Sequence, residues 1–518
     1  MIKRQTITAV ICALLAAVLA IVYFSVIEPM LLPEEEKVTP IEIIDPLEVR
    51  TQDQTRVYMF PPVERARIDK IEVHNKNGGY TFYKSKGDNF YIEGMELAPY
   101  DLMAFTYLVT TAGSAVANER YLIDDNTDLS VYGLAASDDP SYFIITDDND
   151  VTHKVWVGNK AKTGDGYYCQ YDGRKAVYLI RTAGFEVLLA DVYELITPTL
   201  GLPIQQSAYS EVSLFGIVKN GKPVVEIRTL SPEENGTDKT EKPTYTYEFT
   251  PNSLKEFTPN GAARDSSLNL LSGLAGSKVV DYGTPDVLKE KLKTKYGIDV
   301  SNPESWYYCV YYHYTDEAYI YLSAPNEEGM CYAYTSVYNT VVTVPLKSMS
   351  IFHLNTHDFL EKNVVNSHIS LVNKIEIKGT IADEQISVDS AYGLKSTAVD
   401  GTEQTVQTVW NEKTDKQYTA DEVANFKQIY GDLLRLYIEG EVDVRNIADA
   451  DHIASVTVGY TDGTSKTFDF YAYNSTRCYF TVNGNLGDYA LWVHRDNVEK
   501  VIRDTYRFDL GYTIDPNI

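Results

Sequence analysis

A pair of histidines one helical turn apart is the first arrangement in this sequence that could do chemistry. His353 and His357 are followed directly by Asp358, and two imidazoles at this spacing can chelate a transition metal. A closed site needs a third and a fourth ligand, and no HExxH sequence supplies a general base beside the pair. We therefore favour packed or solvated histidines over metal ligands, and we predict no metal site.

Two acidic clusters, at residues 124–128 and 147–150, raise the question of calcium binding. Neither cluster has the spacing, the glycine or the distal glutamate of an EF-hand loop. The second cluster falls where a hairpin turn is expected, and Asp and Asn side chains favour turns by bonding to their own backbone. The sequence therefore favours turns over calcium loops at both places.

The motifs of several large enzyme classes are absent from the sequence. GxSxG, GxxxxGK[ST] and GxGxxG do not occur, and the short segment 164–166 (Gly-Asp-Gly) is too small to cradle a phosphate. With 73 acidic residues in the chain, the presence of carboxylate pairs is no evidence for glycoside hydrolysis. We predict a non-catalytic protein without a cofactor.

Tyrosine is the compositional outlier, with 41 residues. The densest run is 306–314, and the next predicted strand, 318–322, alternates so that Tyr319 and Tyr321 lie on the face opposite Ile320 and Leu322. Such a face could stack on sugar rings or meet a protein, although tyrosine also favours half-buried sheet surfaces for structural reasons. The structural explanation is favoured; the candidate ligand or partner surface comprises Tyr307, Tyr311, Tyr319 and Tyr321.

Composition limits the classes of partner. The 518 residues carry a net charge of −27, which repels phosphate backbones, so we predict no nucleic-acid partner. The chain is too long for a single hydrophobic core and should form several domains. Its 5 cysteines are scattered and contain no CxxC pair, so neither a zinc knuckle nor a thioredoxin-like site is supported.

The N-terminus predicts a single membrane-spanning helix. Residues 6–27 carry no charge. A run of this length is long enough to cross the hydrocarbon core of a bilayer as a helix. Lys3 and Arg4 precede this run and Glu28 follows it, so the positive-inside rule keeps the N-terminus cytoplasmic and exports the rest. The run is long for a cleaved signal peptide and ends without an A-x-A site. We predict a cytoplasmic tip and a membrane anchor at 1–27, with the anchor contacting the lipid bilayer.

Beyond the anchor we predict an α+β protein of mostly antiparallel sheets with packed helices. Residues 28–60, rich in Pro and Glu, are predicted to form an extended stalk. Self-similarity then predicts three tandem modules, at 61–205, 206–366 (the most diverged) and 367–518. Each module should contain a strand pair, a helix, several returning strands and a closing helix.

Local patterns define the elements of these modules. A capping box at Thr419 and Glu422 marks a helix start in the third module. Tyr296-Gly297-Ile298 echoes Tyr132-Gly133-Leu134, each shortly before the returning strands. Gly-bearing turns predict hairpins at 77–79, 220–221, 462–463 and 483–484. In the first module, one helix is predicted from the stripe Leu102, Phe105, Leu108, Val109 and Ala112, and a single closing helix from the stripe between Phe185 and Leu195.

The first module resembles a bacterial family known only as domain of unknown function 4340. The resemblance is carried by residues 60–62 (Phe-Pro-Pro), 68–73, 129–134, Val157-Gly158-Asn159, 163–168 and 176–180, and extends over about 60–200. It implies a membrane-anchored bacterial envelope protein, since some members are associated with ABC export systems of the gliding-motility kind. It implies no catalytic residues.

These observations give two main functional hypotheses, beside a third, an envelope hydrolase, that would require two carboxylates converging in a deep pocket. The first is a membrane-anchored, extracytoplasmic scaffold or accessory subunit of an envelope complex, with a protein partner such as an ABC permease. The alternative is a module that binds cell-wall glycan or another polysaccharide through the tyrosine-rich face.

Overall fold

The computed structural model describes residues 40–85, 89–181, 184–229, 257, 259–398, 405–443, 450–486 and 489–515. The chain divides into two compact units, of which the second begins at Thr197 and also includes Leu97–Pro99. The predicted anchor at 6–27 lies outside the described residues. Within the described ranges, no helix is long and apolar enough to cross a bilayer.

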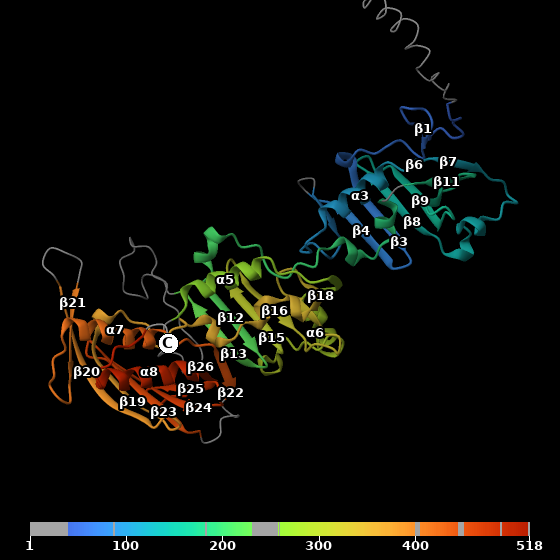
Figure 1. Cartoon of the computed structure of the whole chain (residues 1–518). Helices are drawn as coiled ribbons and strands as arrows, with labels where there is room; N and C mark the ends of the chain where they lie inside the picture. The colour runs from blue at the N-terminus through green and yellow to red at the C-terminus, as the bar shows by residue number, and fades with distance from the viewer. Residues whose placement is uncertain are drawn as a thin grey trace, which may run out of the picture. The chain divides into compact units, whose positions relative to one another are not determined.

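Unit 1 is built on an eight-stranded antiparallel sheet with the order β5-β4-β3-β8-β9-β10-β11-β7 (Figure 1). Its strand β3 alternates as predicted, with Ile68, Ile71 and Val73 turned into the core. The strands are β3 (Ile68–Asn75), β4 (Gly78–Lys84), β5 (Phe90–Ile92), β7 (Glu119–Leu122), β8 (Ser141–Asp147), β9 (Thr152–Lys160), β10 (Tyr167–Tyr171) and β11 (Ala176–Ile180).

Helices pack against this sheet. The helix α3 (Leu102–Gly113) begins where Asp101 accepts hydrogen bonds from two free backbone N–H groups of its first turn, and it buries the predicted stripe except for Leu102. The prediction of a single closing helix between Phe185 and Leu195 is wrong. This segment is divided into α4 (Gly184–Leu189) and the 3-10 helix η5 (Val192–Leu195), because the Asp191 side chain caps a new helix start at the Tyr193 N–H.

Residues 28–60 were predicted to form an extended stalk. For residues 40–60, which the structure describes, this prediction is wrong, because they fold onto unit 1. Strands β1 (Val49–Arg50) and β2 (Val57–Tyr58) form a small sheet with β6 (Val116–Ala117), and Met59 and Phe60 are buried in the core. The Glu48 side chain is buried, with its carboxylate 2.8 Å from Arg120 Nη1 and 2.6 Å from Tyr178 Oη. An acidic residue that suggested a solvated stalk is therefore an internal ion-pair partner.

Unit 2 begins with a seven-stranded antiparallel sheet of order β13-β12-β15-β16-β17-β18-β14. Helix α5 (Gly261–Ser272) follows its first hairpin, and α6 (Pro285–Thr294) precedes β15. The predicted hairpin turn is present, with Asn220 and Gly221 both at positive φ. The strands are β12 (Leu214–Lys219), β13 (Lys222–Arg228), β14 (Lys278–Tyr282), β15 (Tyr308–His313), β16 (Glu317–Leu322), β17 (Met330–Thr335) and β18 (Thr340–Pro345).

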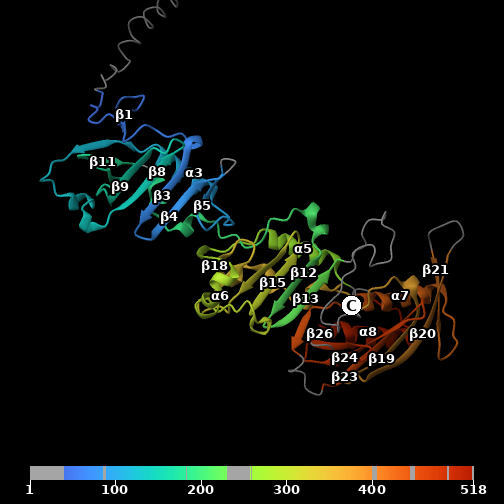
Figure 2. The same cartoon turned by 180° about the vertical axis from the view of Figure 1, so that it is seen from behind.

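The last sheet has eight strands in the order β21-β20-β19-β23-β24-β25-β26-β22, and α7 (Ala420–Leu434) and α8 (Arg495–Asp509) pack on it (Figure 2). The capping box at the start of α7 forms as predicted, between Thr419 and Glu422. The strands are β19 (Val372–Ile381), β20 (Ile386–Ala398), β21 (Thr405–Asn411), β22 (Gly440–Asp443), β23 (His452–Tyr460), β24 (Ser465–Ala472), β25 (Arg477–Val482) and β26 (Tyr489–His494).

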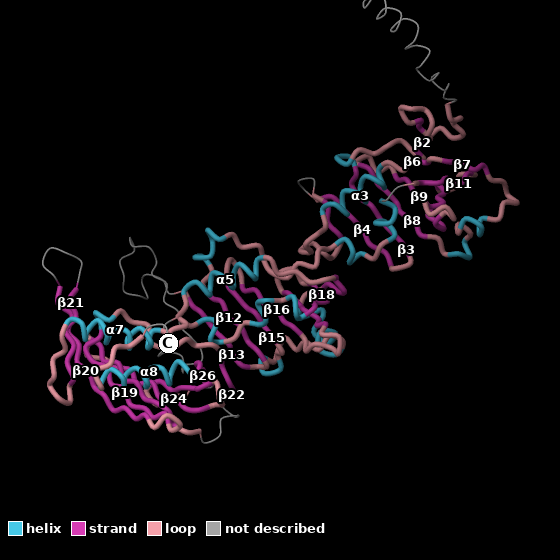
Figure 3. Tube along the Cα trace, in the orientation of Figure 1, coloured by secondary structure: helices cyan, strands magenta, loops and turns pink. Residues whose placement is uncertain are grey.

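The three large sheets share one plan, which is visible in the alternation of strands and helices along the trace (Figure 3). In each, a hairpin leads to a helix (α3, α5 or α7). A strand that follows the helix (β7, β14 or β22) lies at the far edge, beside the last strand of a four-stranded meander. The predicted α+β class with mostly antiparallel sheets is confirmed for the described residues.

Candidate functional site

The predicted tyrosine surface forms a ladder across three strands. Tyr311 lies opposite Tyr319, and Tyr321 lies opposite Tyr334. Successive ring centroids along Tyr311, Tyr319, Tyr321 and Tyr334 are 6.1, 5.8 and 6.4 Å apart. Tyr307 precedes β15 and packs edge-on against Tyr308 instead.

Most of this ladder is covered by other residues. The prediction that Tyr321 belongs to an exposed ligand or partner surface is therefore wrong. Its side chain is 8% exposed and packs in a core with Leu288 and Leu292 of α6. Burial raises the pKa of Tyr321. Tyr311 and Tyr319 are half-buried, and the Tyr311 hydroxyl donates to Glu226 Oε2 at 2.6 Å. Sequence alternation predicted the shared face correctly, but it could not show that α6 packs over it.

The two histidines belong to separate 3-10 helices, η10 (Ser350–His353) and η11 (Thr356–Phe359). His353 Nε2 lies 3.1 Å from the Leu346 carbonyl oxygen, whereas His357 Nδ1 lies 3.5 Å from Glu441 Oε2. Burial is the largest single influence on the pKa of His357 and lowers it, but hydrogen bonding to Glu441 and the nearby Asp358 together outweigh burial, so that this pKa is raised. Among the described residues, no group of three or more His, Cys, Asp or Glu is placed to hold a metal ion.

The acidic clusters form turns. Asp147 Oδ1 accepts the N–H groups of Asn149 and Val151 at 2.9 and 3.0 Å in the β8–β9 hairpin. These backbone bonds, and Arg67 at 2.9 Å, lower the pKa of Asp147. Asp124 caps its own turn through the Asn126 N–H and the Thr127 hydroxyl. The carboxylate oxygens are thus used by the backbone and by neighbouring side chains.

A cleft of about 380 Å³ in unit 1 gathers residues from several separate segments. It opens where the β3–β4 turn, the start of β8, the end of β9 and the start of β10 meet at one end of the sheet, beside the loop that contains Gly133. The polar and motif residues in its wall are Lys76, Asn77, Gly133, Ser141, Gly158, Asn159, Lys160 and Tyr167. Sequence reasoning did not identify this cleft.

Two glycines build one wall of this cleft. Gly133 follows η3 (Leu129–Tyr132) with φ +69°, and a Cβ there would lie 2.5 Å from Asn159 Cγ. A Cβ on Gly158 would lie 2.2 Å from the Tyr132 carbonyl oxygen. Both glycines are therefore needed for the loop to pack directly on β9, and the Asn159 side chain lies against Gly133 at the rim.

The charge of the cleft is opposite to that of the chain. Its wall contains Lys76 and Lys160 and no carboxylate. Lys160 Nζ lies 2.7 Å from Oε1 of Glu186, a residue that does not line the cleft. Among the described residues, Lys76 has no ion-pair partner and the Asn159 amide has no hydrogen-bond partner. Groups that lack protein partners inside a cleft are available to a ligand.

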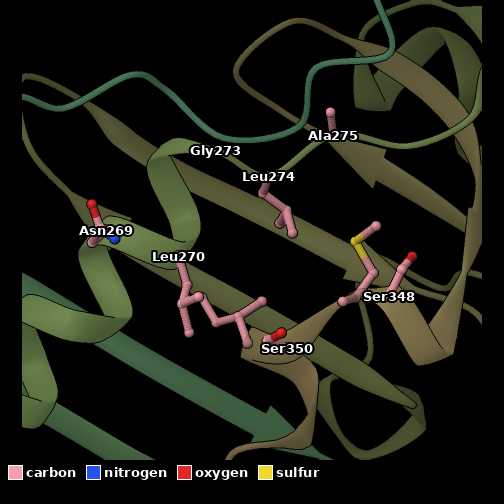
Figure 4. A pocket seen from close by; sticks show the side chains of 9 residues that line it. Asn269, Leu270, Gly273, Leu274, Ala275, Ser348 and Ser350 are labelled. Carbon is pink, nitrogen blue, oxygen red and sulfur yellow. The ribbon is translucent and has the colours of Figure 1, made fainter.

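A second hollow, of about 440 Å³, lies in unit 2 between the C-terminal end of α5 and the segment 348–351 (Figure 4). Its wall is largely apolar, with Leu270, Leu274, Met349 and Ile351. Segment 348–351 follows the last strand of the meander and packs beside α5, as α8 follows β26 and packs beside α7 in the last sheet. Unlike α8, it belongs to a series of short 3-10 helices. The irregular chain leaves this hollow beside α5.

The fold and the first cleft define an α+β protein made of repeated antiparallel sheets, with a small-molecule-sized cleft in the first of them. Residues 91–299 match the family model described as Domain of unknown function (DUF4340). The resemblance is thereby confirmed, and this range holds the motifs at 129–134, 157–159, 163–168 and 176–180. The match begins later than expected, so residues 60–73 do not contribute to it, and it continues into unit 2. Neither a curated protein nor a solved structure matches the chain.

Proposed function

We propose that the chain is a non-catalytic, membrane-anchored scaffold on the extracytoplasmic side of a bacterial envelope. In this role it is an accessory subunit that holds a membrane-embedded protein partner, such as the permease of an ABC-type exporter. The uncharged run at 6–27, with Lys3 and Arg4 before it, supports the membrane anchor and its orientation.

The observation that carries the proposal is the outward face of α3. Leu102, Met103 and Tyr107 are 77%, 69% and 52% exposed, and they lie on adjacent helical positions beside the exposed Thr106. The helix contains no charged residue over its 12 positions, although the chain as a whole carries a net charge of −27.

Such a face has the composition of a protein-binding surface. Methionine and aromatic residues are enriched in interfaces, and charged residues are depleted from interface centres. Complete burial of a side chain such as Leu or Met stabilises a complex by about 1.5–3 kcal/mol. Three side chains that are already more than half exposed could together contribute several kcal/mol before the entropic cost of association.

Affinity purification tests this proposal. The tagged full-length chain is recovered from gently solubilised membranes, and co-purifying proteins are quantified for the wild type and for the double variant Met103→Glu/Tyr107→Glu. We expect a stable partner with the wild type and a large loss with the double variant. The matched control is Val287→Glu on α6, which alters a side chain that is 76% exposed elsewhere and should retain the partner.

Two results would reject the proposal. The first is recovery of the wild-type chain alone in several mild detergents. The second is an equal yield of partner with the α3 double variant, which would show that the complex uses another surface. Circular dichroism of the double variant checks that the fold is kept, since both altered side chains are exposed.

A further inference from the structure

We propose that the cleft in unit 1 binds a carboxylate-bearing sugar. This inference goes beyond the scaffold function and does not depend on it. The sequence offered the tyrosine face as an alternative saccharide site, but Tyr321 is buried there, whereas the cleft in unit 1 offers partner-free polar groups around a defined volume.

Size and shape favour a small ligand. The volume of about 380 Å³ falls within the range of sites that enclose small molecules. The Tyr167 ring forms part of the wall, held in place by stacking on Phe185 with ring centroids 6.4 Å apart. A rigid aromatic wall offers an apolar surface for the C–H groups of a sugar ring.

The charges favour a carboxylate. Lys76 and Lys160 both line the cleft, and no acidic side chain does. Because Glu186 already pairs with Lys160 at 2.7 Å, Lys76 is the cation available to an added negative group. A charge-assisted bond from an ammonium group to a carboxylate is stronger than a neutral hydrogen bond.

The amide groups favour a sugar over a simple anion. The Asn159 amide lies at the rim against Gly133, where it can both donate to and accept from hydroxyl groups. Asn77 donates through Nδ2 to the Leu189 carbonyl at 3.2 Å, which leaves its Oδ1 as an acceptor. A ligand with one carboxylate and several hydroxyls satisfies all of these groups, which acetate or phosphate alone does not.

The test is binding of glucuronate to the purified full-length chain, measured by saturation-transfer NMR and calorimetry, with glucose and acetate as comparison probes. We expect saturable binding of glucuronate and at least about tenfold weaker binding of glucose and of acetate. Lys76→Gln and Asn159→Ala should each weaken glucuronate binding several-fold. The control Lys175→Gln removes the same charge from a lysine that pairs with the exposed Asp125 and should bind as the wild type does.

Four outcomes would overturn the inference. Absence of saturable glucuronate binding removes the site. Equal affinity for acetate reduces it to a general anion site, and equal affinity for glucose removes the role of the lysine. If Lys175→Gln weakens glucuronate binding as much as Lys76→Gln does, the effect belongs to the overall charge of the chain rather than to the cleft.

Discussion

Two buried carboxyl groups between α7 and α8 should make this helix pair sensitive to pH. Asp432 on α7 and Asp504 on α8 are 3% and 2% exposed. Lys500 Nζ lies 2.7 Å from Asp504 Oδ2 and 3.9 Å from Asp432 Oδ1, and Arg435 Nη1 lies 3.4 Å from Asp432 Oδ1. When both carboxyls are ionised, Oδ2 of Asp432 is buried without a hydrogen-bond donor. Protonation of Asp432 removes this buried charge and gives Asp432 a hydroxyl that can donate to Asp504.

The direction and size of the effect follow from the pKa of Asp432. Burial, followed by the hydrogen bond with Asp504, raises this pKa from 3.8 to about 7, although Lys500 and Arg435 lower it. Because the folded-state pKa is the higher one, the stabilisation is fully present below about pH 4 and is lost as the pH rises through about 7. Each pH unit between these values changes the free energy of unfolding by about 1.4 kcal/mol, so raising the pH from 5 to 8 should cost about 3 kcal/mol.

Hydrogen exchange measures this loss where it occurs. Opening of the α7–α8 pair should become up to about a hundredfold more frequent between pH 5 and pH 8, after correction for the intrinsic exchange rate. In Asp432→Asn the amide replaces the protonated carboxyl, so the pH dependence should largely disappear. The control is Glu384→Gln, which removes an exposed ion pair with Arg503 on α8 and should keep the wild-type pH profile.

The reasoning is refuted if α7 and α8 of the wild type show the same corrected protection at pH 5 and pH 8. It is also refuted if Asp432→Asn retains the full pH dependence, since the titrating group would then lie elsewhere.

Three further substitutions test the packing described above. Glu48→Gln should destabilise unit 1 by about 3–5 kcal/mol because it leaves the buried Arg120 without its carboxylate partner, whereas Arg174 keeps Asp45 at 2.8 Å; limited proteolysis within 41–60 should accelerate, unlike in the exposed-pair control Asp125→Asn. Gly158→Ala should destabilise unit 1 by about 1–3 kcal/mol, because its Cβ would lie 2.2 Å from the Tyr132 carbonyl oxygen; thermal unfolding followed by hydrogen exchange checks this. Gly431→Ala should instead stabilise α7 by about 0.5–1 kcal/mol, since it lies within the helix with open space around its Cβ; slower exchange in α7 is the expected result.

Local patterns in the sequence predicted most elements because each pattern has a local physical cause. The turns at Asn220-Gly221 and Asp462-Gly463 form because Asn220, Gly221 and Gly463 tolerate positive φ. The capping box at Thr419 forms because its partners are three residues apart. The echo between segments 132–134 and 296–298 was informative for the same reason, since Gly133 and Gly297 have φ values of +69° and +68°.

What the sequence could not reveal depends on contacts between distant segments. Glu48 belongs to a Pro- and Glu-rich stretch, and only the positions of Arg120 and Tyr178 in the fold make it an internal residue. Tyr321 alternates as an exposed residue would, and α6 buries it. The cleft is assembled from residues between Lys76 and Leu189, and its one local signal was the pair of glycine-bearing motifs at 132–134 and 157–159.

The folding of residues 41–60 onto unit 1 also constrains the proposed scaffold. If residues 6–27 span the membrane, only the 13 residues 28–40 separate the end of that run from the first residues that pack on unit 1, beginning at Ile41. An extended chain rises about 3.4 Å per residue, so this tether reaches at most about 45 Å, against about 110 Å for a free stalk over 28–60. On that condition, the proposed scaffold would keep the outward face of α3 near the bilayer, where the extracytoplasmic surface of an integral membrane protein is a partner that it could meet. Such a short tether would also raise the effective concentration of unit 1 near a partner in the same membrane.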